Sequence, residues 1–283
     1  MKIAIIGANG MLGSELSSYF LNKNQEVYLL THGEIEVSDM ATFEGAFGDF
    51  VPEIIINTAC CHVAASEASP YQSFLVNAIG AYNVATYAEK VGAILVHYST
   101  DYVFDGKFSK HVNEEEKPNP INTYGVSKLA GEQMVRNNCS RHFIIRTGAM
   151  YGAEPSRGKD NTNFVLSIIK KAKEQDKIEV VSNCLVSPTW TMQLAKNLMY
   201  LLDSPEYGTY HMVALGDGSY YDFAKLIVDE LRLPATIVPV ERHFGNTPQY
   251  PLLDNKNLEV IRINKMDFWD RALKRFLLNF EAV

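Results

Sequence analysis

The chain has 283 residues, of which 47% are hydrophobic and 21% are charged, which allows one large domain or two modest ones with a sizeable core. A formal net charge of −7 argues against a general nucleic-acid-binding surface. No apolar run approaches the ~18 residues of a membrane span, and the apolar start is too short for a signal peptide, so we expect a cytoplasmic protein that binds neither membranes nor nucleic acid.

Short apolar runs alternate with helical segments through the first half of the chain. The runs predict strands at 2–6, 26–30, 53–57, 93–99 and 142–146. The segments between them predict helices at 11–23, 42–47, 71–91 and 122–137. Several runs are apolar throughout, as in strands that are buried on both faces of a parallel sheet. This alternation predicts an α/β fold with a doubly wound, Rossmann-like parallel sheet.

The alternation loosens after residue 146. Later segments predict a long loop at 151–161 and a strand at 178–181. They also predict helices at 163–174, 191–202 and 221–231. The tail from Tyr207 also holds two strand candidates and a final amphipathic helix near 267–280. We expect an N-terminal domain at 1–150, with 177–205 packing back on it, and a smaller C-terminal lobe at 151–283.

Cysteine spacing gives no sign of a metal site or a disulfide framework. The four cysteines are Cys60, Cys61, Cys139 and Cys184, with no CxxC pair among them. Adjacent cysteines are poor disulfide partners for geometric reasons. We therefore expect reduced, buried thiols and no metal.

Three glycines separate the first predicted strand from the first predicted helix. Gly7, Gly10 and Gly13 remove the Cβ atoms that would block a pyrophosphate from the backbone. The following helix N-terminus offers unpaired N–H groups and a positive dipole end. The position of this pattern predicts that 1–150 is a dinucleotide-binding domain. A plain tight turn is the alternative.

The end of the second predicted strand bears on the choice between NAD and NADP. Enzymes that prefer NAD usually carry an acid there, which binds the ribose 2′-hydroxyl. Here the strand is followed by Thr31-His32-Gly33-Glu34, with no acid directly after it. His32 could meet a 2′-phosphate and Thr31 could donate a hydrogen bond to it. NADP(H) is therefore expected over NAD(H), with an ordinary exposed histidine as the alternative.

Tyr124 and Lys128 lie four residues apart on a predicted helix and should project from one face. A cation within ~4 Å is expected to lower the pKa of a phenol from about 10 by a few units, toward the range of general acid catalysis. Lys128 could also hold a nicotinamide ribose. Ligands bind beyond the carboxyl ends of strands, so Thr100, or Ser99, should hydrogen-bond the substrate carbonyl. These residues together predict a reductase, with 151–283 mainly substrate-binding.

Three motifs give the chain a resemblance to a known family. GANGMLG at 7–13, STDYVFDG at 99–106 and YGVSK at 124–128 resemble the extended short-chain dehydrogenase/reductases, nearest the dTDP-4-dehydrorhamnose reductase branch. The resemblance implies NAD(P)H-dependent reduction of the 4-keto group of a nucleotide-linked deoxysugar. It implies a catalytic set of Thr100, Tyr124 and Lys128. It also implies cofactor contacts from Gly7, Asn9, Gly10, Met11, Leu12, Gly13, Ala59, Cys60, Tyr124 and Lys128.

The substrate half departs from the pattern of that branch. The position of its usual Trp is Ala149, and the late Arg-Pro-x-x-Ser pattern reads TPQYP at 247–251. Basic residues at 157, 159 and 242 are candidate diphosphate ligands. The substrate-binding candidates are Asp101, Tyr102, Val103, Ala149, Arg157, Asn163 and Arg242. The expected partners are a small-molecule nucleotide sugar and, as an option, a second copy of the chain in a homodimer.

Two other functions stay open. An epimerase or dehydratase of the same superfamily would share the fold, but related dehydratases carry Asp-Glu after the catalytic Thr, and Thr100 is followed by Asp101-Tyr102. A non-catalytic, NADP(H)-binding regulatory subunit would fit a changed substrate half. Intact Tyr124 and Lys128 argue against that function.

Overall fold

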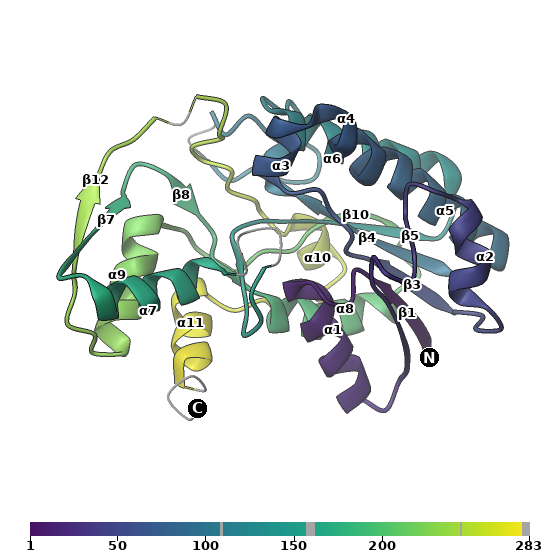
Figure 1. Cartoon of the computed structure of the whole chain (residues 1–283), viewed down its shortest axis with the longest axis horizontal. Coiled ribbons are helices and arrows are strands. Elements are labelled where there is room, and N and C mark those ends of the chain that lie inside the picture. Colours follow the sequence, from purple (N-terminus) through teal and green to yellow (C-terminus); the bar gives the residue numbers. More distant parts are fainter. Residues whose placement is uncertain (108–109, 157–161, 244, 279–283) are drawn as a thin grey trace.

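A six-stranded parallel sheet forms the centre of the molecule (Figure 1). The computed structural model describes residues 1–107, 110–156, 162–243 and 245–278. The strand order is β10-β5-β4-β3-β1-β2, and every neighbouring pair is parallel. The strands are β1 (Lys2–Ile6), β2 (Glu26–Leu30), β3 (Ile54–Asn57), β4 (Ile94–Thr100), β5 (His142–Thr147) and β10 (Gly208–His211).

Helices cover both faces of this sheet. In β1, Ile3 and Ile5 enter one apolar core while Ala4 and Ile6 enter the other, because successive side chains of a strand point to opposite faces. The predicted doubly wound sheet is confirmed. The first core is covered by α1 (Met11–Asn22) and α8 (Thr191–Leu202), the second by α2 (Ala41–Phe47), α5 (Gly80–Val91) and α6 (Thr123–Asn138).

The helix predicted at 71–91 is confirmed in its extent, but one turn of it is π-helical. It is preceded by α3 (Val63–Ala68) and divided into α4 (Pro70–Phe74), the π-helix η1 (Leu75–Ile79) and α5. The π-helical turn packs against α6. A Cβ on Gly131 of α6 would overlap the carbonyl oxygen of Asn77, so only glycine allows this approach. Among the described helices, none has both the length and the apolar character needed to cross a membrane.

A smaller lobe has its own apolar core, around Tyr151, Phe223 and Phe276. Its helices are α7 (Phe164–Glu174), α9 (Tyr220–Glu230) and α11 (Trp269–Leu278). Its paired strands are β7 (Lys177–Val181) with β12 (Thr236–Val240), β8 (Leu185–Val186) with β11 (Gly218–Ser219), and β6 (Met150–Tyr151) with β9 (Thr189–Trp190).

The chain crosses between the two parts more often than the sequence predicted. In the segment 177–205, α8 packs on α1 as expected, whereas β7 pairs with β12 in the lobe. The tail from Tyr207 is not confined to the lobe, because β10 pairs with β5 and buries Tyr210 in the main core. The short helix α10 (Lys256–Val260) packs beside β10. The boundary at residue 150 stays a prediction.

Candidate active site

A cavity of about 410 Å³ lies beyond the carboxyl ends of β1, β3 and β4. It is the place where the order of the sheet reverses, which is where open α/β sheets bind ligands. The cavity joins the glycine loop to the side chains of Tyr124 and Lys128. Every residue predicted to contact a cofactor lines it: Gly7, Asn9, Gly10, Met11, Leu12, Gly13, Thr31, His32, Ala59, Cys60, Tyr124 and Lys128.

The glycine loop fits a pyrophosphate. Gly7 has a φ of +81°, and a Cβ there would lie 2.6 Å from the hydroxyl oxygen of Thr58. A Cβ on Gly13 would lie 2.9 Å from the Cα of Ala8 and still closer to the carbonyl oxygen of Gly7. The N-cap of α1 is Gly10, which makes no side-chain cap, and the first turn holds no acid. The N–H groups of this turn therefore face the cavity without a competing carboxylate.

The tip of β2 differs in part from the prediction. His32 lines the cavity, and its Nδ1 lies 3.3 Å from a carboxylate oxygen of Glu36, which also lines it. The backbone N–H of Thr31 donates to the Glu34 carboxylate at 2.8 Å, and its hydroxyl donates to the same oxygen. The donation from Thr31 to a 2′-phosphate stays a prediction, because Thr31 lines the cavity but its hydroxyl would have to turn away from Glu34 to make that bond.

Thr100 and Tyr124 meet across the junction of β4 and α6. The helix begins after Asn122, whose side chain caps it by accepting the N–H of Gly125 at 2.8 Å. The hydroxyl of Tyr124 hydrogen-bonds with the side chain of Thr100 and lies 3.8 Å from Cys60 Sγ. The Thr100 hydroxyl donates to Asp101 Oδ1 at 2.9 Å. The predicted acid and its predicted hydroxyl partner are thus in contact.

The prediction that Lys128 lowers the pKa of Tyr124 is wrong. Burial raises the pKa of Tyr124 well above its ordinary value, and the nearby Cys60 adds to the rise. Lys128 is only 2% exposed, and its ammonium donates to the carbonyl oxygen of Tyr98 at 2.6 Å. Burial also lowers the pKa of Lys128. Tyr124 is therefore a neutral phenol at pH 7, with a proton available to give.

Two substrate-binding candidates lie beside Tyr124. Tyr102 packs edge-on against it, with ring centroids 5.8 Å apart. Asp101 is buried, and its carboxylate fills the space where Gly148 would carry a Cβ. Ala149 is partly exposed, with the unusual φ of +44°, and stays a candidate. These residues surround the acid without lining the cavity itself.

The other candidates among the described residues do not line the cavity. Val103 is fully buried in an apolar cluster, so its predicted substrate contact is wrong. Asn163 caps α7 and donates its amide to the carbonyl oxygen of Gly152, which commits its polar atoms to the backbone. Arg242 is exposed and pairs with Glu179 at 3.1 Å. Arg157 and Lys159 lie outside the described residues.

The sequence missed part of the cavity wall. Thr58 follows β3, so the strand-end rule that selected Thr100 could have found it. Ser99 was considered only as a substitute for Thr100, yet it lines the cavity. Met150 of β6 and Ser156 beyond it also line the cavity, and no local pattern marks them.

Comparison with known proteins identifies close relatives across the whole chain. The model of the RmlD substrate binding domain family matches residues 1–282. A spore coat polysaccharide biosynthesis protein, SpsK of Bacillus subtilis, is 34% identical over 98% of this chain and 96% of its own. The dTDP-4-dehydrorhamnose reductase of Salmonella typhimurium is 33% identical over 89% of this chain and 85% of its own.

Solved structures agree with the sequence comparisons. The dTDP-4-dehydrorhamnose reductase of Bacillus anthracis, in complex with NADP, has a TM-score of 0.92 and 33% identity, with 98% of this chain and 99% of that chain covered. A UDP-glucose 4-epimerase of Thermus thermophilus has a TM-score of 0.82 at 19% identity, over 95% of this chain and 96% of that chain. At that identity the likeness shows the fold alone.

Proposed function

Because the chain belongs to the RmlD substrate-binding-domain family, we propose that it is an NADP(H)-dependent reductase of the 4-keto group of a nucleotide-linked deoxysugar, as in the dTDP-4-dehydrorhamnose reductases. One observation carries this proposal. A single cavity joins the glycine loop to Tyr124 and Lys128, and Tyr124 touches Thr100. Binding of a dinucleotide and donation of a proton can therefore occur at one place.

The glycine loop suits the pyrophosphate of NADP(H), whereas the tip of β2 holds both a histidine and carboxylates. Bound in the cavity, NADPH supplies the hydride for the reduction. Gly7, Gly10 and Gly13 leave room for its pyrophosphate at the start of α1. Lys128 is placed to hold the nicotinamide ribose, and His32 to meet the 2′-phosphate. The neighbouring carboxylates of Glu34 and Glu36 oppose that phosphate, so His32 is the residue on which the preference for NADP(H) depends.

Tyr124 donates the proton in this mechanism. Reduction of a ketone leaves an alkoxide, which is a far stronger base than a phenolate, so even a phenol of raised pKa gives up its proton to it. Thr100, in contact with Tyr124, is placed to hydrogen-bond the same oxygen.

The alternatives lack comparable support. A dehydratase would need the acid pair that the Thr100-Asp101-Tyr102 sequence does not supply. A regulatory subunit would have no use for the buried Lys128, since burying an ammonium group costs free energy. The likeness to the 4-epimerase concerns the fold only.

A homodimer and a cytoplasmic location are part of the proposal. Large apolar side chains are exposed along α4, η1, α5 and the start of α6: Tyr71 (76% exposed), Phe74, Ile79, Tyr82 and Val126. Such a patch is typical of an interface. Light scattering should give a dimer for the parent protein and a monomer for Tyr71→Glu combined with Tyr82→Glu. A cytoplasmic location follows from the substrates, which are charged and do not cross membranes.

The function is tested by the loss of NADPH absorbance with a panel of nucleotide-linked 4-keto sugars. Oxidation in the presence of a dTDP-linked 4-keto-6-deoxy sugar is expected, and none is expected with the corresponding 4-hydroxy sugar. NADPH binding without turnover of any sugar in the panel would support the regulatory alternative instead.

A further inference from the structure

One face of α6 carries an ionisable side chain every four residues: Tyr124, Lys128, Glu132 and Arg136. Side chains at this spacing share a helix face. The first two belong to the proposed catalytic set. The other two have no part in the chemistry described so far, although Glu132 is fully buried and lies one helical turn beyond Lys128.

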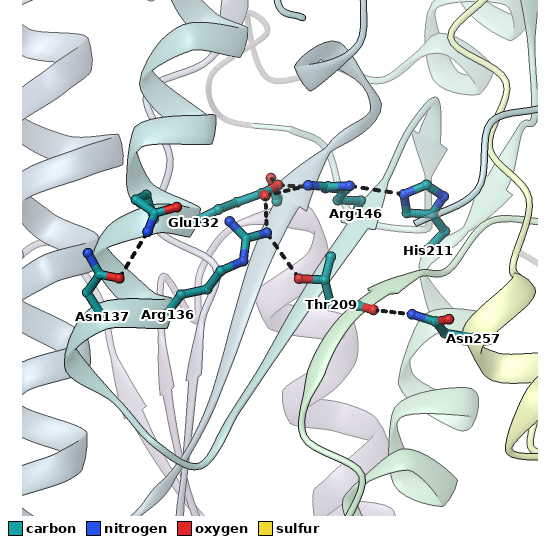
Figure 2. A network of polar contacts seen from close by, with 9 residues as sticks. Glu132, Arg136, Asn137, Arg146, Thr209, His211 and Asn257 are labelled. Atoms are coloured by element: carbon teal, nitrogen blue, oxygen red, sulfur yellow. Dashed lines mark hydrogen bonds and ion pairs between the residues drawn. The ribbon is translucent and has the colours of Figure 1, made fainter. Parts of the chain in front are cut away.

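The Glu132 carboxylate is held from several sides. Ser99, which lines the cavity and precedes Thr100, donates its hydroxyl at 2.6 Å. Arg146 of β5 donates to both oxygens, at 2.9 and 2.7 Å, and Arg136 donates at 2.7 Å. Figure 2 shows both arginines converging on this carboxylate. Burial opposes the charge, but the hydrogen bonds and charge of Arg146 hold the pKa of Glu132 at about 2.

The arginines are themselves fixed by neighbouring strands. Arg136 also donates to the hydroxyl of Thr209 in β10 at 3.1 Å. Arg146 lies over the ring of Phe104 and reaches Nε2 of His211 at 3.4 Å (Figure 2). Burial and Arg146 lower the pKa of His211 to about 3, so this imidazole is neutral and accepts that bond. The Glu132 carboxylate is thus permanently charged, and its partners are held by hydrogen bonds to neighbouring strands.

We propose that Glu132 is a positioning residue of the active site. It fixes the carboxyl end of β4 against α6 and places a permanent negative charge one turn from Lys128, which keeps the buried ammonium charged over the working pH range. This inference rests on the proposed reductase function. β4 is tied to α6 at consecutive residues: Tyr98 by Lys128, Ser99 by Glu132, and Thr100 by Tyr124.

The charges around Lys128 favour this role for Glu132. Burial lowers the pKa of Lys128, while Cys60 and Glu132 raise it. His97 of β4 faces the same space, but burial lowers its pKa well below the ordinary value, so it carries no charge at pH 7. Tyr124 is neutral for the reason given above. The ionisable groups that face the pair Lys128 and Glu132 are Cys60, His97, Tyr124, Arg136, Arg146 and His211.

The direction of the effect follows from the charges. The carboxylate of Glu132 favours the charged form of Lys128, while the cations Arg136 and Arg146 beside Glu132 offset part of this. Removing the Glu132 charge should therefore move the deprotonation of Lys128 to lower pH.

The test measures the charge of Lys128 directly, in the full-length protein without substrate. Lys128 is acetylated with acetic anhydride over a pH series, and its modification is read by mass spectrometry. In Glu132→Gln the reaction should begin at lower pH than in the parent, and the alkaline fall of kcat should move the same way. Asp229→Asn is the matched control, because Asp229 and Lys225 form an exposed pair at the same spacing.

The change Glu132→Gln leaves two arginines facing a buried amide, which can prevent folding. Two further variants test the inference in that case. Arg136 is partly exposed, so Arg136→Gln should fold, and it removes a cation from the same cluster. It should move the deprotonation of Lys128 to higher pH. The double variant Glu132→Leu with Arg146→Leu removes the buried ion pair. It should move the deprotonation of Lys128 to lower pH. A midpoint equal to the parent's in the folded variants would overturn the inference.

The outcomes separate this inference from the proposed function. Acetylation needs neither NADPH nor sugar, so it tests Glu132 even if the parent reduces no sugar. A parent that reduces the sugar, with variants whose Lys128 midpoints do not move, would leave the function standing and reject the role of Glu132.

Discussion

Replacement of Gly13 by alanine tests the glycine loop most sharply. The added Cβ would lie 2.9 Å from the Cα of Ala8 and closer still to the carbonyl oxygen of Gly7, both of which are backbone atoms that cannot rotate away. The loop must therefore shift, which moves its N–H groups away from the pyrophosphate. Loss of one hydrogen bond to a charged group costs about 1.5–3 kcal/mol, so we expect the Kd for NADPH to rise by roughly 10- to 150-fold.

Gly45→Ala is the matched control for that change. Gly45 lies in α2, where a Cβ would meet nothing within 4 Å. Alanine is favoured over glycine in a helix by about 0.5–1 kcal/mol, so this variant should be slightly more stable and bind NADPH like the parent. Both are measured by titrating NADPH fluorescence, with circular dichroism to verify folding. A folded Gly13→Ala that binds NADPH as tightly as Gly45→Ala would refute the placement of the pyrophosphate.

Tyr124→Phe should lower kcat by ~10² to 10⁴ with little change in NADPH affinity, and normal turnover would remove Tyr124 as the acid. His32→Arg should raise the ratio of kcat/KM with NADPH to that with NADH, because a guanidinium pairs well with a phosphate; an unchanged ratio would exclude His32 from the 2′-phosphate site. Since burial lowers the pKa of His211 to about 3, below an unfolded value near 6.5, the unfolded chain binds more protons between these pH values and stability falls as pH drops through them. The free energy of unfolding of His211→Gln, measured with urea, should depend less steeply on pH in this range than that of the parent. An equal slope in the two proteins would contradict this account of His211.

Local patterns were enough for the sheet and the glycine loop. The strands β1 to β5 lie within one or two residues of their predicted positions, because each is a short apolar run. The inner strands are buried on both faces, whereas the edge strand β2 is partly exposed. The strand β10 was not assigned to the sheet, since half of GTYH is polar and its place depends on pairing with β5. The π-helical turn was missed because no local pattern marks it; it packs against Gly131 of α6, which is distant in the sequence.

In the site too, local sequence predicted the positions of residues, but not the properties that depend on tertiary contacts. The spacing of Tyr124 and Lys128 correctly placed both in one cavity. It gave the wrong sign for the pKa of Tyr124, because burial and the bond from Lys128 to Tyr98 are tertiary facts. Arg242 looked like a phosphate ligand from its charge alone, but it pairs with Glu179 on the lobe surface.

The central claim is that Tyr124 gives a proton to the carbonyl oxygen of a sugar held in the same cavity as NADPH. Its most direct test is rapid mixing of the NADPH-loaded protein with dTDP-4-dehydrorhamnose, for the parent and for Tyr124→Phe. The parent should oxidise NADPH in step with formation of the 4-hydroxy sugar, and Tyr124→Phe should bind both ligands while oxidising NADPH at least ~10²-fold more slowly. Equal rates in the two proteins, or no oxidation by the parent, would contradict the claim.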